Sequence, residues 1–159
     1  MSYVHITINI CKIHIVNHYR REVDDLDIVT KMQINVPKEQ VFEAFINPDH
    51  IGGFWFSSSS QRWEEGKSIT LRYEEYDAEL DVQIERIDPN NKIEFTWGPH
   101  PVAIHFEDNG QNTVVTTIEK HFDSTEVEQI LGQKEGWVYM LSCLKAYLEH
   151  GVSIRAAIL

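Results

Sequence analysis

Five segments with the alternating apolar pattern of β-strands follow one another from residue 68 onward. They cover residues 68–76, 79–88, 91–98, 101–108 and 112–121. The separators between them are short and rich in turn residues, as at Pro89-Asn90 and Asn109-Gly110. A parallel crossover needs a dozen or more residues, so strands this close in sequence must pair antiparallel. This spacing predicts an antiparallel meander.

Alternation along these strands separates two faces of the predicted sheet. Apolar side chains fill one face, which collects Ile69, Leu71, Tyr73, Leu80, Val82, Ile84, Ile93, Phe95, Trp97, Val102, Ile104, Phe106, Val114, Thr116 and Ile118. The opposite face is polar, with Arg72, Asp81 and Glu85 among its side chains. The apolar face offers almost no titratable group. We therefore expect a sheet that is wet on one side and covers an apolar interior with the other.

An amphipathic helix is expected after the last strand. Its apolar stripe consists of Trp137, Leu141, Leu144 and Leu148. Gly132 and Gly136 are expected to break or kink it, so its firm part covers residues 134–150 and ends at Gly151. Thr125 and Glu128 have the spacing of a capping box. Many strands followed by one closing helix predict an α+β helix-grip fold, with a curved antiparallel sheet wrapped around a long C-terminal helix.

The chain before the meander divides into an extension and the start of the body. Residues 1–25 alternate in two successive phases and are expected to form an N-terminal extension with an extra strand. Residues 26–159 are expected to form one domain, which begins with a strand at 26–36.

Two short helices are expected after this first strand. Pro37 favours the first turn of one helix, and Asn47 can cap a second helix that the glycine pair at Gly52 ends. The serines at residues 57–60 then indicate a mobile polar loop.

Charge and cysteine usage exclude several classes of partner and site. A formal net charge of -11 disfavours nucleic acid and anionic membranes, because a phosphate-binding surface needs clustered Lys and Arg. No apolar run approaches the ~20 residues of a membrane-spanning helix, so membrane insertion is not expected. No signal-peptide cleavage site is recognisable, and a cytoplasmic protein is expected. Cys11 and Cys143 lie far apart without metal-ligand spacing, and we expect no metal site and no cofactor.

An ordered set of motifs spans about residues 27–151. The set comprises residues 36–45, 47–51, 54–56, Gly66, 82–97, Thr113, 136–137, Leu141 and Leu144. In these motifs the chain resembles the bacterial homologues of the activator of the heat-shock-protein ATPase (AHSA-type), within the START-like (SRPBCC) helix-grip superfamily. It departs from the family at Phe54, where Trp is usual, and at Lys67, where Gly is usual. The resemblance implies a carrier or sensor of hydrophobic small molecules, while other relatives are cyclase-like enzymes or co-chaperones.

Aromatic side chains supply the candidate ligand site. The residues expected to line an apolar cavity are Phe54, Trp55, Phe56, Tyr73, Phe95, Trp97, Trp137, Met140 and Leu141. The alternative is that they simply fill the core. No catalytic residue is assigned, and the weak candidates are Glu75 at a strand end and His100 in a turn. Both also fit ordinary exposed positions.

Three hypotheses of function follow. The favoured one is a binding protein, not an enzyme, that holds a hydrophobic, aromatic or lipid-like small molecule between the sheet and the C-terminal helix. The second is a cyclase- or hydrolase-like enzyme of the same fold. The third is an activator-like or adaptor protein that pairs with another chain, and a homodimer through the N-terminal extension or a strand edge is also open. A cavity of at least ~300 Å³ under the last helix favours the first two, and a filled interior favours the third.

Overall fold

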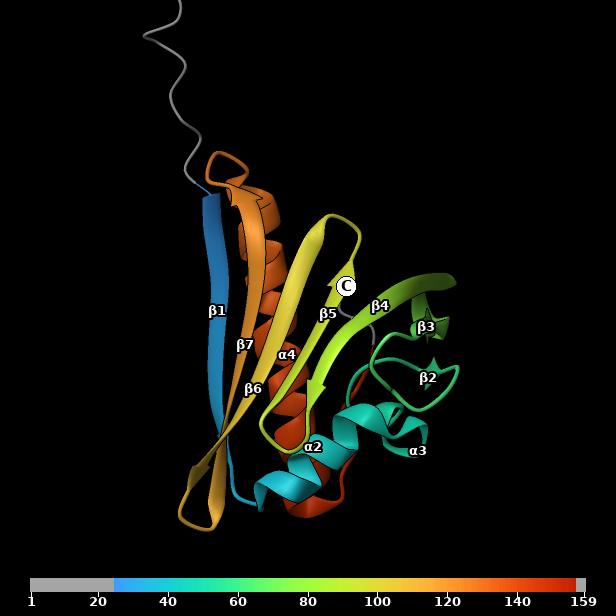
Figure 1. Ribbon diagram of the computed structural model, residues 1–159, viewed down its shortest axis with the longest axis vertical. Helices are drawn as coiled ribbons and strands as arrows, with labels where there is room; N and C mark the ends of the chain where they lie inside the picture. The colour runs from blue at the N-terminus through green and yellow to red at the C-terminus, as the bar shows by residue number, and fades with distance from the viewer. Residues whose placement is uncertain (1–24, 157–159) are drawn as a thin grey trace, which may run out of the picture.

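The computed structural model describes residues 25–156 and has an α+β architecture (Figure 1). A curved antiparallel sheet lies on one side, and a long C-terminal helix crosses it, so the expected helix-grip fold is confirmed. The extra strand expected in residues 1–25 falls on residues that lie almost wholly outside the described part of the chain. That strand, and a dimer formed through it, stay predictions.

The sheet has seven strands in the order β1-β7-β6-β5-β4-β3-β2. The elements are β1 (Asp25–Ile34), α2 (Lys38–Ile46), α3 (Pro48–Ile51), β2 (Ser58–Ser59), β3 (Ser68–Tyr73), the 3-10 helix η1 (Glu74–Tyr76), β4 (Ala78–Asp88), β5 (Lys92–Trp97), β6 (His100–Asn109), β7 (Asn112–Asp123) and α4 (Val127–His150). Every neighbouring pair runs antiparallel. β3 to β7 form the expected meander, and β1 joins it beside β7.

The two short helices form where the sequence predicts them. α2 begins directly after Pro37, and α3 has Pro48 in its first turn. The Asn47 side chain caps α3 by accepting a hydrogen bond from the backbone N–H of Asp49 at 3.0 Å. The serine segment differs from the expected mobile loop, because β2 pairs with β3 and the Ser60 N–H donates to the Thr70 carbonyl at 2.9 Å.

Helix α4 is longer than expected. It begins at Val127 and runs through Gly132 and Gly136 without a break. Each glycine costs about 1 kcal/mol relative to alanine, but tertiary packing of a helix's apolar face outweighs such local costs. The expected capping box does not form, because Glu126 precedes the helix without a side-chain cap. Gly151 ends α4 in the left-handed conformation, as predicted.

The expected phase of β7 is wrong. Val114 and Ile118 are only half-buried, whereas Val115, Thr117 and Glu119 are completely buried. Directly paired residues of antiparallel strands share a face. Val115 pairs with Phe106 and Glu119 with Val102 on β6, so these β7 residues face the interior. The side chain of Glu119 therefore lies on the face that was expected to offer almost no titratable group.

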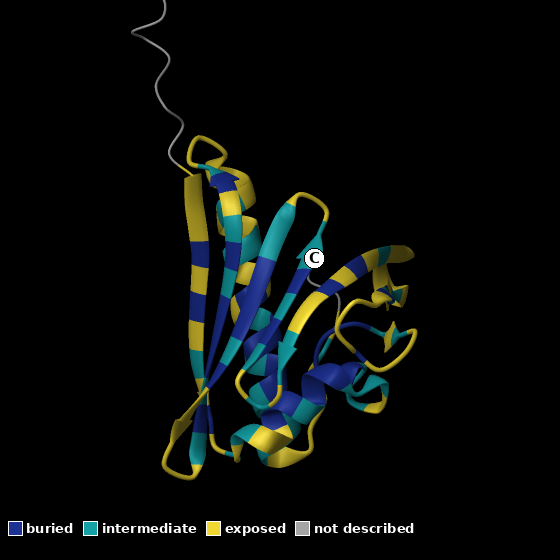
Figure 2. Cartoon of the chain, viewed as in Figure 1, coloured by how far each residue is buried: buried dark blue, intermediate teal, exposed yellow. Residues whose placement is uncertain are grey.

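The core lies between the concave face of the sheet and the helices. Figure 2 shows buried residues concentrated on β6, on α2 and in the middle of α4, whereas the strand ends and turns are exposed. The largest fully buried side chains are Trp63, Phe45, Phe54, Phe56, Phe95 and Phe122. The meander thus forms one wall and α4 the other wall of an aromatic-rich interior.

Gly53 gives a test of the packing between the α3 region and α4. A Cβ atom at Gly53 would overlap the ring of Tyr147, which is held by a 2.9 Å hydrogen bond to His50 and by stacking on Phe54. We expect Gly53→Ala to lower the free energy of unfolding by about 1–3 kcal/mol, as overpacking does. Chemical denaturation measures this.

The matched control is Gly132→Ala. A Cβ at Gly132 meets no atom within 4 Å, and the residue lies inside α4. This change is expected to stabilise the fold by about 0.5–1 kcal/mol. Equal effects of the two substitutions would contradict the close contact at Gly53.

Candidate functional site

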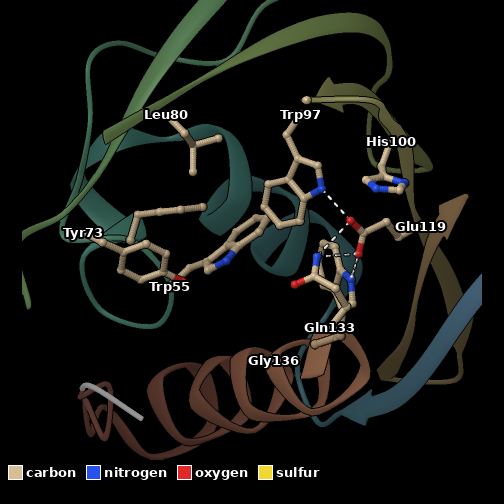
Figure 3. A pocket seen from close by; sticks show the side chains of 11 residues that line it. Trp55, Tyr73, Leu80, Trp97, His100, Glu119, Gln133 and Gly136 are labelled. Carbon is tan, nitrogen blue, oxygen red and sulfur yellow. Dashed lines mark hydrogen bonds between the residues drawn. The ribbon is translucent and has the colours of Figure 1, made fainter. Parts of the chain in front are cut away.

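A cavity of about 420 Å³ lies between the sheet and α4 (Figure 3). Its lining residues are Trp55, Phe56, Tyr73, Leu80, Trp97, Gly98, His100, Glu119, Gln133, Gly136 and Trp137. They come from the loop after α3, from strands β3 to β7 and from the first half of α4. These residues are far apart in the sequence, and folding brings them together. The meander contributes one lining side chain from each of its strands, and α4 closes the opposite side.

Flat aromatic rings form most of the cavity wall. Trp137 contacts two other indoles, with ring centroids 5.5 Å from Trp55 and 5.4 Å from Trp97, and those two rings are themselves 6.0 Å apart. The rings of Phe56 and Tyr73 are 4.5 Å apart at the other side. These tilted contacts are favourable for aromatic pairs and hold the rings in place. The result is a rigid surface suited to a planar apolar molecule.

One end of the cavity is polar and is organised by Glu119. This side chain is completely buried and accepts hydrogen bonds from the indole N–H groups of Trp97 at 2.6 Å and Trp137 at 2.7 Å. The Gln133 amide donates to both carboxylate oxygens, at 3.0 and 3.2 Å. All three partners are donors, so Glu119 acts purely as an acceptor, as an ionised carboxylate does. It links β5, β7 and α4.

His100 lies beside this polar end. Its ring stacks on Phe122 with centroids 4.1 Å apart and an interplanar angle of 8°. Nδ1 is 2.9 Å from the carbonyl oxygen of Lys120. A carbonyl only accepts, so Nδ1 carries a proton and donates this bond. The hydrogen bond and the stacking together fix the orientation of the ring.

The structure separates the expected cavity residues into three groups. Trp55, Phe56, Tyr73, Trp97 and Trp137 line the cavity. Phe54 and Met140 instead line a smaller hollow of about 60 Å³ next to it. Phe95 and Leu141 are buried in the core.

The two weak catalytic candidates lie in different places. His100 lines the cavity, whereas Glu75 is outside its lining. Glu75 pairs with Arg155 and accepts a hydrogen bond from the Ser57 hydroxyl at 2.9 Å. Its own backbone N–H, then Ser57 and Arg155, lower the pKa of the Glu75 carboxyl. These contacts hold Glu75 as a tether between the loop after α3 and the C-terminal segment.

Sequence reasoning missed the polar residues that organise the site. Glu119 was absent from the expected inner face because β7 was assigned the opposite phase. Gln133 was missed because α4 was expected to be firm only from residue 134, one residue later. Leu80 was placed on the correct face but not among the cavity residues.

Tyr73 gives a pH test of burial at the site. Burial raises the pKa of Tyr73 to about 12. We therefore expect an alkaline titration of phenolate absorbance to contain one transition near that pH, and Tyr73→Phe to remove it. A raised folded-state pKa means that the stabilisation is complete below the unfolded pKa of about 10 and is lost as the pH rises toward the folded value. A titration unchanged by the substitution would contradict this environment.

Other chemistry is limited in the described residues. No group of three or more His, Cys, Asp or Glu side chains placed to hold a metal ion is found within residues 25–156. Cys143 is buried, and burial raises the pKa of its thiol, in agreement with an unreactive cysteine. In the same part of the chain, no helix combines the length and the apolar character that crossing a membrane requires.

Comparison with known proteins places this geometry in a family. The family described as "Activator of Hsp90 ATPase homolog 1-like protein" matches residues 35–149. The crystal structure of SSP2350 from Staphylococcus saprophyticus is 70% identical, with a TM-score of 0.80, and the match covers 84% of this chain and 98% of that chain. Comparison with curated proteins finds no significant match.

More distant structures share the fold. The solution structure of the Aha1 dimer from Colwellia psychrerythraea is 18% identical, with a TM-score of 0.68 and coverage of 79% of this chain and 98% of that chain. DynU16, from the dynemicin biosynthetic locus, is 19% identical, with a TM-score of 0.74 and coverage of 82% of this chain but 49% of that chain. The family match spans most of the sequence, and the chain belongs to the AHSA1-like family of the START-like (SRPBCC) superfamily.

Proposed function

We propose that this protein binds an aromatic or otherwise hydrophobic small molecule in the cavity between the sheet and α4, as a carrier or a sensor. The observation that carries the proposal is the cavity itself, about 420 Å³ in volume and walled mainly by aromatic rings. Small-molecule sites are typically concave, of about 300–1,000 Å³, and apolar with a few placed polar groups. The cavity has each of these properties.

The aromatic wall is built to keep its shape. The ring contacts of Trp137 and the hydrogen bonds of Glu119 hold the indoles in place without any ligand. A preformed wall reduces the ordering cost of binding. An adaptor without a ligand would have no need of such a space, and a filled interior would serve it better.

An enzyme of the cyclase type is the second candidate. The observation in its favour is that Glu119 and His100 lie beside an apolar cavity, where an acid or base could act on a bound substrate. The origin of DynU16 in a biosynthetic locus points in the same direction. Binding is favoured because Glu119 already accepts four hydrogen-bond contacts from three donors, which leaves it poorly placed to exchange a proton.

Native mass spectrometry tests the binding proposal. The protein would be purified gently from its host and examined for a retained small molecule, and released material would be identified. The blocking variant is Gly136→Leu, because Gly136 lines the cavity and a Cβ there meets no atom within 4 Å. We expect the added side chain to occupy the cavity and to reduce ligand retention at least tenfold, roughly the effect of losing 1.4 kcal/mol of binding.

Gly132→Leu is the matched control. Gly132 lies one turn earlier in α4, has equally open space around its Cβ and does not line the cavity. It should retain ligand as the wild type does. If the wild type retains nothing and shows no thermal stabilisation by any member of an aromatic panel, the proposal fails. Equal retention by the two leucine variants would also count against this cavity.

A further inference from the structure

We infer that the ligand presents a hydrogen-bond donor, a hydroxyl or an amino group, to the Glu119 end of the cavity, and that the cavity rejects carboxylates and other anions. This inference rests on the proposed function and names the chemical class of the ligand. It is supported by a set of hydrogen-bond acceptors at that end that have no partner within the described residues.

Glu119 sets the sign of the charge in the cavity. Among the described residues that line the cavity, Glu119 is the one Asp, Glu, Lys or Arg. Because it is completely buried, its charge is weakly screened by solvent. An anion in the same space would be repelled, whichever way round it was bound.

Gln133 adds an unused acceptor. The carboxylate of Glu119 can only accept, so the Gln133 amide must turn its nitrogen toward it, and the 3.0 Å contact shows this orientation. The amide oxygen then points away from Glu119 toward the aromatic wall (Figure 3). Within residues 25–156 this oxygen has no hydrogen-bond partner. A ligand donor can reach it without displacing any existing bond.

His100 adds a second acceptor. Since Nδ1 donates to the Lys120 carbonyl, the uncharged tautomer that this bond selects has its lone pair on Nε2. No partner for Nε2 exists in the described part of the chain, and the residue lines the cavity. The free groups of Gln133 and His100 are thus both acceptors, beside a carboxylate that is also an acceptor. A hydroxyl or an amine complements this set, whereas a carboxylate does not.

The opposite end of the cavity supplies no compensating cation. Tyr73 and Trp55 lie there, and burial keeps the Tyr73 hydroxyl protonated by raising its pKa to about 12. Arg155 lines the adjacent smaller hollow, but its charge is already paired with Glu75. Tyr73 can donate to a ligand carbonyl, yet an anion would find no unpaired positive charge at either end.

Isothermal titration calorimetry with three matched probes tests the inference on the wild-type protein. The probes are a naphthol, the corresponding methylnaphthalene and the corresponding naphthoate, which share a ring and differ in one group. We expect the naphthol to bind roughly tenfold tighter than the methyl compound, as one hydrogen bond supplies. The naphthoate should bind at least roughly tenfold weaker than the methyl compound.

Two variants test whether the preference for the naphthol comes from the polar end of the cavity. Gln133→Leu removes the free amide oxygen and should bring the affinities for the naphthol and the methyl compound closer together by several-fold. Gln129→Leu, the same change one turn earlier at an exposed position of α4, should leave both unchanged.

The outcomes separate the two proposals. Equal affinities for the three probes, or tighter binding of the naphthoate, would overturn the inference and leave the proposed function standing. Failure of all three probes to bind would overturn the proposed function, and the inference with it. A naphthol preference that Gln133→Leu leaves intact would overturn the assignment of the donor to the Gln133 oxygen.

Discussion

Replacing Glu119 by alanine is expected to lower the free energy of unfolding by about 2–5 kcal/mol. The carboxylate accepts from two indole N–H groups and one amide, and its removal leaves Trp97, Trp137 and Gln133 without that partner. A buried donor left unsatisfied costs about 1–3 kcal/mol. The loss is measured by chemical denaturation, and near-ultraviolet circular dichroism should change too, because the two indoles lose the group that orients them.

Glu107→Ala provides the control for removing a negative charge. Glu107 is exposed on β6, so its replacement should change stability by no more than about 0.5 kcal/mol. The chain has a net charge of -11, and each of the two substitutions removes one negative charge, so the change in net charge is the same for both. Equal stabilities of the two alanine variants would mean that the Glu119 hydrogen bonds contribute nothing to the fold.

The architecture was predictable because independent local signals agree. Short turn-rich separators require antiparallel pairing, Asn47 and Pro48 start a helix, and Gly151 ends one. None of these signals depends on distant packing. The limits of α4 were less predictable, because Gly132 and Gly136 weaken the helix locally while the packing of its buried face, which the sequence does not display, maintains it.

The phase of β7 could not be taken from its own residues. Positions 113–118 are all threonine, valine or isoleucine, so both faces have the same apolar, β-branched character. A usable signal lay in the preceding turn. Asn109 pairs with Asn112 across a two-residue connection, and counting back along both strands brings Val102 opposite Glu119. Turn geometry sets register in hairpins, so this count would have placed Glu119 on the inner face.

Composition alone could not separate cavity lining from core. Trp55 and Phe95 are both aromatic and both buried, yet Trp55 lines the cavity and Phe95 packs against Trp63 with centroids 5.3 Å apart. Whether a buried ring lines the cavity or packs in the core depends on where the neighbouring rings leave space. That space is set by the angles at which the rings pack against one another. The sequence predicts an aromatic interior, and the three-dimensional packing decides where it is hollow.

Trp137→Ala is expected to lower the free energy of unfolding by about 3–5 kcal/mol, as truncation of a large buried aromatic side chain does. Trp137 is 3% exposed, contacts the rings of Trp55 and Trp97 and donates to Glu119 at 2.7 Å. Chemical denaturation measures the loss. Trp137→Phe keeps an aromatic ring but loses the N–H, so about 1–3 kcal/mol is expected for it. Equal losses of stability in Trp137→Ala and Trp137→Phe would mean that Trp137 stabilises the fold mainly through its hydrogen bond to Glu119. A loss below about 1 kcal/mol for alanine would mean that the indole contributes little to the fold and lines the cavity without supporting it.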